Sequence, residues 1–228
     1  MIVGNQKPFK EIMASVSKFK KVLVLGCGTC VAVCLTGGDK EAHAMARSLT
    51  HAFQDHPDPP SFEVNTIERQ CEKDWLESFF EISDDIDAVL SLACGAGVQT
   101  VADVYNHLPV IPGLNTTFLG ALDRPGEWNE KCRGCGNCVL ADTGGICPVT
   151  RCAKSLLNGP CGGSSNGKCE ISAIVGRDVE CAWQLIIERL SALGKLENYN
   201  KIRPPKDWSN GTAQGPRRLK QTEDTPFR

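Results

Sequence analysis

The chain has 228 residues, a formal net charge of −2 and 13 cysteines, several-fold more cysteine than an ordinary soluble protein carries. A hydrophobic fraction of 41% and a charged fraction of 23% argue against a disordered chain. The near-neutral charge argues against a nucleic-acid-binding protein, which is usually clearly basic. No apolar run approaches the roughly 20 residues of a transmembrane helix.

The cysteines indicate metal or redox chemistry rather than a disulfide scaffold. The first 21 residues contain no long apolar segment and no cleavage site typical of a secretory signal, so we expect a cytoplasmic protein. An odd cysteine count would also leave one thiol unpaired in a disulfide framework. In a reducing compartment, clustered cysteines indicate metal binding, redox chemistry or both.

The cysteine and proline distribution predicts three parts. Residues 1–124 contain five cysteines, and residues 125–194 contain eight, seven of them between Cys132 and Cys169. Residues 195–228 contain four prolines and eight Lys or Arg against four Asp or Glu, so we expect an extended basic tail. We expect this tail to wrap a partner subunit and to become ordered on binding, the alternative being a flexible end.

The first part alternates between predicted strands and helices. Strands are expected at Lys21–Leu25, Ser61–Ile67 and Ala88–Leu92, with a fourth around Thr117–Leu119. Asp39 is predicted to cap a helix that continues to Phe53. Further helices are expected around residues 75–80 and 98–105. This alternation predicts an α/β fold with an open, mostly parallel sheet flanked by helices, followed by a small cysteine-rich metal-binding domain.

Cysteines follow three of the predicted strands: Cys27, Cys71 and Cys94. Because ligand sites in open parallel sheets gather at the carboxyl ends of the strands, we expect these thiols at one edge. The alternative is that some of them are small buried hydrophobic residues, and this alternative is strongest for Cys34 and Cys71.

The first cluster, Cys27-x2-Cys30-x3-Cys34, has three interpretations. Gly26-Cys27-Gly28 could imitate a dinucleotide-binding turn, but the third glycine is missing. Cys27 and Cys30 could form a thioredoxin-type redox pair, which leaves Cys34, Cys71 and Cys94 unexplained. The favoured interpretation is an iron–sulfur cluster, which needs four thiolates and therefore a further, distant cysteine.

The second cluster matches the first three ligands of a bacterial ferredoxin loop, at Cys132, Cys135 and Cys138. A Cys-Pro pair, Cys147–Pro148, follows after a longer insert than the ferredoxin pattern has. Four further thiols suit another cluster or a structural zinc, and they are Cys147, Cys152, Cys161 and Cys169. All histidines lie upstream, so an ordinary zinc site here uses only cysteine. The alternative is a zinc-stabilised domain without electron transfer.

The rest of the sequence predicts packing rather than catalysis. Asp178 is predicted to cap a helix through Leu193 that Gly194 ends, with Cys181 on it as a core residue or a spare ligand. No catalytic triad, phosphate-binding loop or carboxylate pair can be argued from spacing. The pattern indicates electron-carrying sites without an evident substrate site, and thus a non-catalytic subunit.

Several segments resemble a known family: LVLGCGTCVAVCLTGGDKEA, ERQCE, AVLSLACGAGVQT, CRGCGNC, NGPCGGSSNGKCE and IRPPKDWS. The chain is similar to the small, MetV-type subunit of methylenetetrahydrofolate reductase, including the C-terminal cysteine-rich domain of that family. The resemblance implies 4Fe–4S clusters, from one to three with two favoured, and zinc in a four-cysteine site. It also implies a hetero-oligomer with a flavin-containing catalytic subunit and an electron-donor protein: a ferredoxin, an NADH-oxidising module or a heterodisulfide-reductase-like unit.

The ligand hypothesis gives Cys27, Cys30 and Cys34 to the first cluster, with Cys94 favoured over Cys71 as the fourth ligand. Cys132, Cys135 and Cys138 belong to the second, while the partition of the remaining cysteines stays open. Two other functions are a structural zinc-binding assembly subunit of the same complex and a thiol–disulfide oxidoreductase that uses Cys27 and Cys30.

Overall fold

The computed structural model describes residues 1–210. The chain divides into two compact units, the first spanning Met1–Asn129 and the second beginning at Glu130. Each unit has its own fold and its own core. Within residues 1–210, no helix is both long enough and apolar enough to cross a membrane.

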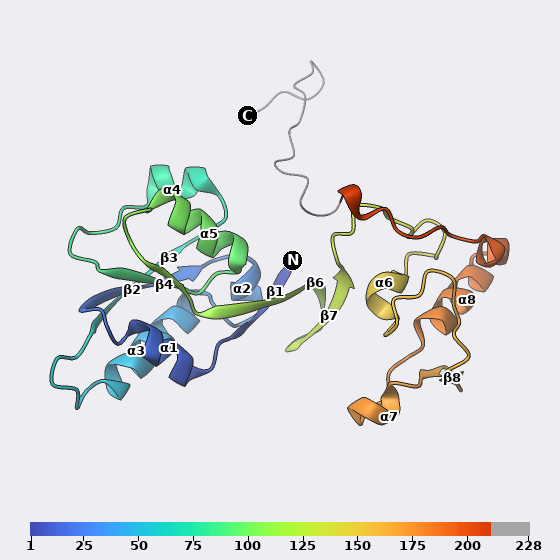
Figure 1. Ribbon diagram of the computed structural model, residues 1–228, viewed down its shortest axis with the longest axis horizontal. Coiled ribbons are helices and arrows are strands. Elements are labelled where there is room, and N and C mark those ends of the chain that lie inside the picture. Colours follow the sequence, from blue (N-terminus) through green and yellow to red (C-terminus); the bar gives the residue numbers. More distant parts are fainter. Residues whose placement is uncertain (211–228) are drawn as a thin grey trace, which may run out of the picture. The chain divides into compact units, whose positions relative to one another are not determined.

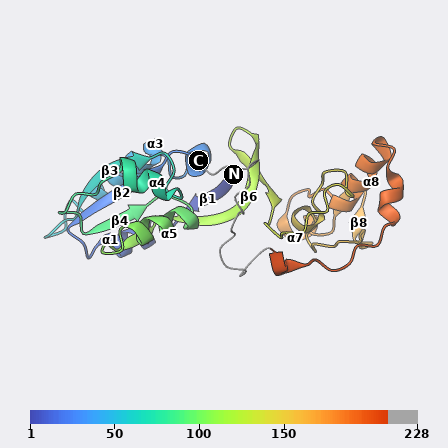
Figure 2. The same cartoon turned by 90° about the horizontal axis from the view of Figure 1, so that it is seen from above.

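The first unit is an α/β fold, as predicted. Its parallel sheet has the strand order β3-β2-β4-β5. A second, antiparallel sheet has the order β1-β6-β7, and β1 runs beside the long strand β6 (Figure 2). The elements are β1 (Ile2–Gln6), α1 (Phe9–Val16), β2 (Lys21–Cys27), α2 (Cys30–Val33), α3 (Asp39–Ala52), β3 (Ser61–Ile67), α4 (Lys73–Phe79), β4 (Ala88–Ser91), α5 (Gly95–Val104), β5 (Val110–Pro112), β6 (Leu114–Arg124) and β7 (Glu127–Cys132).

The core of this unit follows from the two-residue period of β2. Val22 and Val24 pack with α1 and α3 on one face, whereas Leu23 and Leu25 pack with α4 and α5 on the other. Figure 1 shows these helix pairs on opposite sides of the sheet. A strand with both faces covered must be apolar throughout, which is why this segment is a continuous hydrophobic run.

One expectation for the strands of this unit needs correction. Thr117–Leu119 does lie in a strand, but that strand is β6, which pairs antiparallel with β1. The fourth parallel strand is β5 instead. The sequence pattern did not predict β1, which gives β6 a partner outside the parallel sheet.

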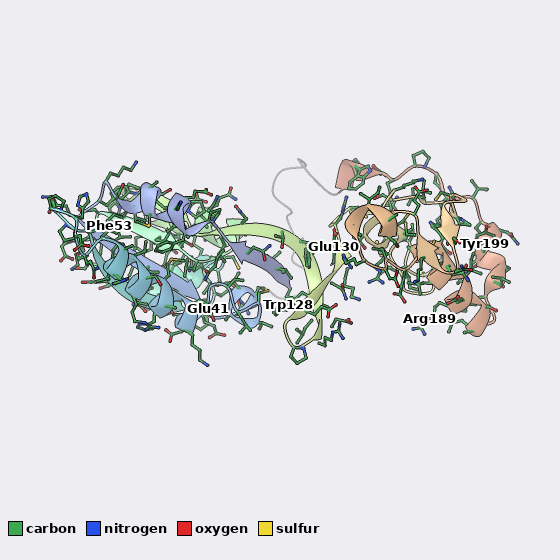
Figure 3. All side chains as sticks on the ribbon, turned by 90° about the horizontal axis from the view of Figure 1, so that it is seen from below. Glu41, Phe53, Trp128, Glu130, Arg189 and Tyr199 are labelled. Carbon is green, nitrogen blue, oxygen red and sulfur yellow. The ribbon has the colours of Figure 1, made fainter. Side chains whose placement is uncertain are left out.

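The start of α3 also differs from the expectation. Gly38, not Asp39, occupies the cap position, and its backbone N–H donates to a carboxylate oxygen of Glu41 at 2.9 Å (Figure 3 labels Glu41). The carboxylate therefore satisfies the N–H of the cap residue, which is the half of a capping box that needs no side chain on Gly38. At the other end of α3, Phe53 stacks on Phe62 of β3 with ring centroids 6.2 Å apart.

The second unit has little regular structure. Its elements after β7 are α6 (Pro148–Arg151), β8 (Ser164–Ser165), β9 (Lys168–Cys169), α7 (Ser172–Val175), α8 (Ala182–Ala192) and the 3-10 helices η1 (Leu196–Asn200) and η2 (Trp208–Asn210). Its apolar core is a cluster of Cys181, Trp183, Ile186 and Leu190, on which Cys152 and Tyr199 pack.

Helix α8 begins later than predicted. Asp178 does not cap it, because residues 178–181 are held by the β8–β9 segment: Cys181 N–H donates to Gly167 O at 2.8 Å and Glu180 bridges to Lys168. The Asp178 carboxylate instead pairs with Lys168 at 2.5 Å. The predicted end is confirmed, because Gly194 follows the helix with φ 65° and Lys195 N–H bonds to Leu190 O.

In the described part of the predicted tail, Tyr199 and Arg203 pack against Trp183 of α8. Arg203 is 7% exposed, and its guanidinium lies 5.6 Å from the ring centroid of Trp183. The guanidinium also donates to main-chain carbonyls, among them Asp142 O at 3.1 Å and Asn198 O at 3.3 Å. The rest of the tail, residues 211–228, lies outside the described residues, so its proposed role in partner binding stays a prediction.

Candidate functional site

The parallel sheet brings three cysteines to its carboxyl edge. Cys27 is the last residue of β2, Cys94 is the cap residue of α5 directly after β4, and Cys71 lies in the turn that follows β3. The parallel register, with Cys27 opposite Ile67 and Leu25 opposite Ser91, aligns these strand ends. The edge is where open parallel sheets build their ligand sites.

The pKa of the Cys71 thiol depends on the other two thiols of this edge. The residue is largely exposed, yet partial burial of its sulfur raises the pKa of the thiol. Cys94 raises this pKa further, followed by Cys27, because two nearby thiolates repel the charged form. The Arg69 guanidinium lowers the pKa of Cys71 by less than the two thiolates raise it. A metal cation would supply the counter-charge directly by binding the thiolates.

The other two cysteines of the first cluster lie on or next to α2. Cys30 is its first residue and is half-buried. Cys34 is buried, and its thiol donates to the carbonyl oxygen of Ile2 in β1 at 3.4 Å. Burial raises the pKa of Cys34. The structure therefore places Cys34 against β1, with Cys30 as a neighbour that also raises its pKa, while Cys27, Cys71 and Cys94 lie at the ends of their strands.

One residue of this edge was missed by the sequence analysis. Gln70 is completely buried, and its amide bonds to Leu25 O, Gly26 O and Ser91 Oγ. Ser91 provided a signal, since it is a lone polar residue in the apolar strand AVLSLA and buried polar groups are almost always paired. The partner itself could not be read from the sequence, because it comes from a different segment.

In the second unit, the CRGCGNC loop directs backbone groups toward sulfur. Gly134 N–H donates to Cys132 Sγ at 3.3 Å, and Cys135 Sγ lies 3.7 Å from Asn137 O. Gly134 and Gly136 have φ values of 63° and 74°, a conformation that residues with a Cβ rarely adopt. N–H donors of this kind contribute to the potential of a cluster bound by the thiolates.

Cys147 belongs to the neighbourhood of this loop. It precedes α6, whose Thr150 hydroxyl donates to Lys131 O at 3.3 Å, directly before Cys132. Lys131 and Cys147 also line the same cavity of about 270 Å³. These contacts place Cys147 beside the start of the ferredoxin-like loop.

The remaining cysteines gather around the start of α8. Ser164 and Cys169 are directly opposite one another in the β8–β9 pair, so their side chains share a face. Burial alone would raise the pKa of Cys181, but hydrogen bonds from Ser164 and from the N–H groups of Gln184 and Trp183 lower it. Cys152 packs against the same core cluster as Cys181.

Cys161 lies on a neighbouring glycine-rich turn. Its sulfur accepts a hydrogen bond from Gly163 N–H at 3.4 Å and lies 3.8 Å from Lys154 Nζ. The lysine also forms an ion pair with Glu170, which follows Cys169 in the chain. A cation and an N–H donor therefore lie beside the same sulfur.

The cysteine thiols are the right kind of ligand for a metal–thiolate centre. Among residues 1–210, no three metal-ligating side chains are arranged so that they could hold a metal ion. All thirteen cysteines are free thiols. Thiolates are the ligands of 4Fe–4S clusters and of structural zinc. The residues that would hold such centres are therefore present at the strand ends and in the glycine-rich turns.

The fold and these groups define an α/β protein with a cysteine-rich second unit. Residues 111–209 match the family model described as "Methylene-tetrahydrofolate reductase C terminal". This match starts in β5 and includes η1 and Arg203. A search of curated proteins found no match, and neither did a search of solved structures.

Proposed function

We propose that this chain is an iron–sulfur electron-transfer subunit that relays electrons between a donor protein and the flavin of a methylenetetrahydrofolate reductase catalytic subunit. The observation that carries the proposal is the convergence of Cys27, Cys71 and Cys94 from three separate segments at one sheet edge. The family match over residues 111–209 supports the association with this reductase.

At the sheet edge we assign Cys27, Cys71 and Cys94 to the first cluster, with Cys30 as the fourth ligand. Cys30 is half-buried and lies only three residues beyond Cys27, at the start of α2. Cys34 is set aside because its thiol bonds to β1. This assignment changes the ligand set expected from the sequence, which favoured Cys34 and had Cys71 as the less favoured fourth ligand.

In the second unit we assign Cys147 to the ferredoxin-like loop, as the fourth ligand beside Cys132, Cys135 and Cys138. The hydrogen bond from Thr150 of α6 to Lys131 O brings the helix that follows Cys147 next to Cys132, and Cys147 and Lys131 line one cavity. A second four-thiolate set then comprises Cys152, Cys161, Cys169 and Cys181, supported by the Ser164 contacts and the packing of Cys152 on the core. It suits a further cluster or a zinc ion.

A bound 4Fe–4S cluster supplies one-electron transfer. The chain's own residues hold the sulfurs and set their surroundings. Gly134 and Gly163 donate N–H groups to Cys132 and Cys161, and Lys154 places a positive charge beside Cys161. Such donors and charges stabilise the more negative, reduced state of a centre and so raise its potential.

The partners follow from the same proposal. An electron relay needs two docking surfaces, one for the flavin-containing catalytic subunit and one for a donor such as a ferredoxin, an NADH-oxidising module or a heterodisulfide-reductase-like unit. The complex is thus a hetero-oligomer, and we place it in the cytoplasm, where thiols remain reduced.

Co-purification with the catalytic subunit tests this function, followed by assays with the donor protein and with an artificial donor. Cys135→Ala should slow donor-dependent reduction of the flavin while artificial-donor activity remains. Arg133→Ala, in the same loop, is the matched control, because it removes only the exposed pair with Glu130. A protein that remains monomeric, or an equal loss of both activities, would contradict the relay.

The second candidate is a structural zinc-binding assembly subunit of the same complex. It is favoured by the packing of Cys152 and Cys181 within the core of the second unit, because structural zinc sites are closed and contribute to folding. The third function, thiol–disulfide exchange through Cys27 and Cys30, is disfavoured. Cys27 is only 6% exposed, whereas an exchanging thiolate must be accessible.

A further inference from the structure

We propose that Gln70 is the positioning residue that sets the spacing of the thiols of Cys27, Cys71 and Cys94. The inference rests on the proposed function, because it assigns these thiols to one metal centre. Gln70 is 0% exposed and its side-chain amide is fully engaged with the sheet edge. Its amide bonds to the chain just before Cys27 and, through Ser91, to the chain just before Cys94. Gln70 itself directly precedes Cys71.

The first link runs to the end of β2. Gln70 Nε2 donates to Leu25 O and to Gly26 O, both at 2.9 Å. Gly26 directly precedes Cys27, so these bonds fix the main chain from which the Cys27 thiol extends. Because Gln70 directly precedes Cys71, these two bonds also tie the turn after β3 to the end of β2.

The second link runs to the end of β4. Ser91 Oγ donates to Gln70 Oε1 at 2.6 Å and accepts from Ala93 N–H at 3.3 Å. Ala93 directly precedes Cys94. Gly97 of α5 packs against the same place, since a Cβ there would lie 2.7 Å from Ala93 Cβ and 3.0 Å from Gln70 Cβ. The close packing of Gln70 and Ala93 against α5 therefore requires a glycine at position 97.

The buried amide of Gln70 thus connects the residues that precede all three thiols: Gly26 by a direct bond, Ala93 through Ser91, and Gln70 itself. A surface loop such as residues 68–72 would otherwise hold Cys71 loosely, because loops are the mobile parts of a fold. Side chains that orient metal ligands in this way commonly change metal affinity by roughly 10–100-fold when they are replaced. Gln70 contributes no ligand atom itself; it acts through the position of the ligands.

The test compares Gln70→Met with Tyr105→Phe in the full chain. Gln70→Met keeps the length of the side chain and removes its hydrogen bonds. Tyr105→Phe is the matched control, because its hydroxyl also donates to two main-chain carbonyls of the first unit, Leu76 O at 3.1 Å and Phe80 O at 2.7 Å. Tyr105 lies at the opposite end of α5 from Cys94.

Two measurements are made. In reconstituted protein carrying Cys135→Ser and Cys181→Ser, which removes both centres of the second unit, Gln70→Met should release iron to a chelator about 10–100-fold faster and alter the EPR spectrum. In metal-free protein, a short bifunctional thiol reagent should cross-link Cys71 to Cys94 or Cys27 less efficiently. Tyr105→Phe should leave both readouts unchanged.

Equal behaviour of the two variants would overturn the positioning role. If the wild-type first site takes up no iron, the proposed function fails there, while the cross-linking yield still decides the role of Gln70. Should Gln70→Met not fold, Ser91→Ala removes the bonds of Ser91 Oγ to Gln70 and Ala93 but keeps those of Gln70 to β2. It is expected to give the same changes, but smaller ones. Unchanged cross-linking in a folded Ser91→Ala protein would then count against the proposal.

Discussion

The thiol of Cys34 donates to the carbonyl oxygen of Ile2 over 3.4 Å, so the third cysteine of the CxxCxxxC motif contacts β1. The motif alone suggests that Cys27, Cys30 and Cys34 act together. The contact with β1 is the basis on which we propose Cys71, whose pKa is raised by Cys94 and Cys27, in place of Cys34. This difference leads to opposite expectations for two single substitutions.

Cys34→Ala should retain the iron of the first site, whereas Cys71→Ser should lose it. Cys34→Ala removes one buried hydrogen bond and should lower the free energy of unfolding by about 1 kcal/mol. Iron content per chain, measured in a background that carries Cys135→Ser and Cys181→Ser, compares the two variants. Loss of iron in Cys34→Ala with retention in Cys71→Ser would restore the ligand set expected from the sequence.

The alkylation of Cys71 should depend on its neighbours. In metal-free protein, its reaction with iodoacetamide should have a pH midpoint above that of an ordinary cysteine, because burial and then Cys94 and Cys27 raise its pKa. Cys94→Ser should lower this midpoint more than Cys27→Ser. Mass spectrometry of the Cys71 peptide gives the rate at each pH, and identical midpoints in all three proteins would show that these thiols do not interact.

The partition of cysteines in the second unit predicts separate losses. Cys147→Ser should remove the centre of the ferredoxin-like loop, and Cys181→Ser should remove the other centre while leaving the first. Metal analysis and the spectrum of Co²⁺-substituted protein report each site, since a four-thiolate cobalt site has strong charge-transfer bands. A Cys181→Ser protein with its full metal content would show that Cys181 is only a core residue.

Arg203 should stabilise the second unit through its packing on Trp183 and its bonds to carbonyl oxygens. Arg203→Ala should destabilise α8 by about 1–3 kcal/mol, since a charged hydrogen-bond donor and a cation–π contact are lost together. Native-state hydrogen exchange of the α8 amides gives the value. Lys195→Ala, an exposed neighbour, should change it little, and equal effects of the two variants would argue against this role.

The sequence predicts the parallel sheet well because β2 and β4 are continuous apolar runs. The ends of β3 match the predicted Ser61–Ile67. It also predicts that Cys27, Cys71 and Cys94 share an edge, since parallel strands place their carboxyl ends together. β1 is not predicted, because its residues IVGNQ are a short segment with no clear alternation, and its pairing with β6 is a contact between distant parts of the chain.

The contacts on which the proposed ligand sets rest are likewise non-local. Cys34 and Ile2 are 32 residues apart, and Gln70 lies 45 residues from Leu25. Spacing in a motif carries no information on such pairs. The late start of α8 has the same origin: Asp178 is a good cap residue, but its carboxylate pairs with Lys168 across the chain.

The proposed relay requires that the clustered thiols carry iron and sulfide. Anaerobic purification of the full chain, followed by metal and acid-labile sulfide analysis and by EPR before and after reduction, measures this. We expect about four iron and four sulfide per cluster, and an EPR signal that appears on reduction. A protein that contains zinc and no iron after anaerobic purification and reconstitution would contradict the proposed relay.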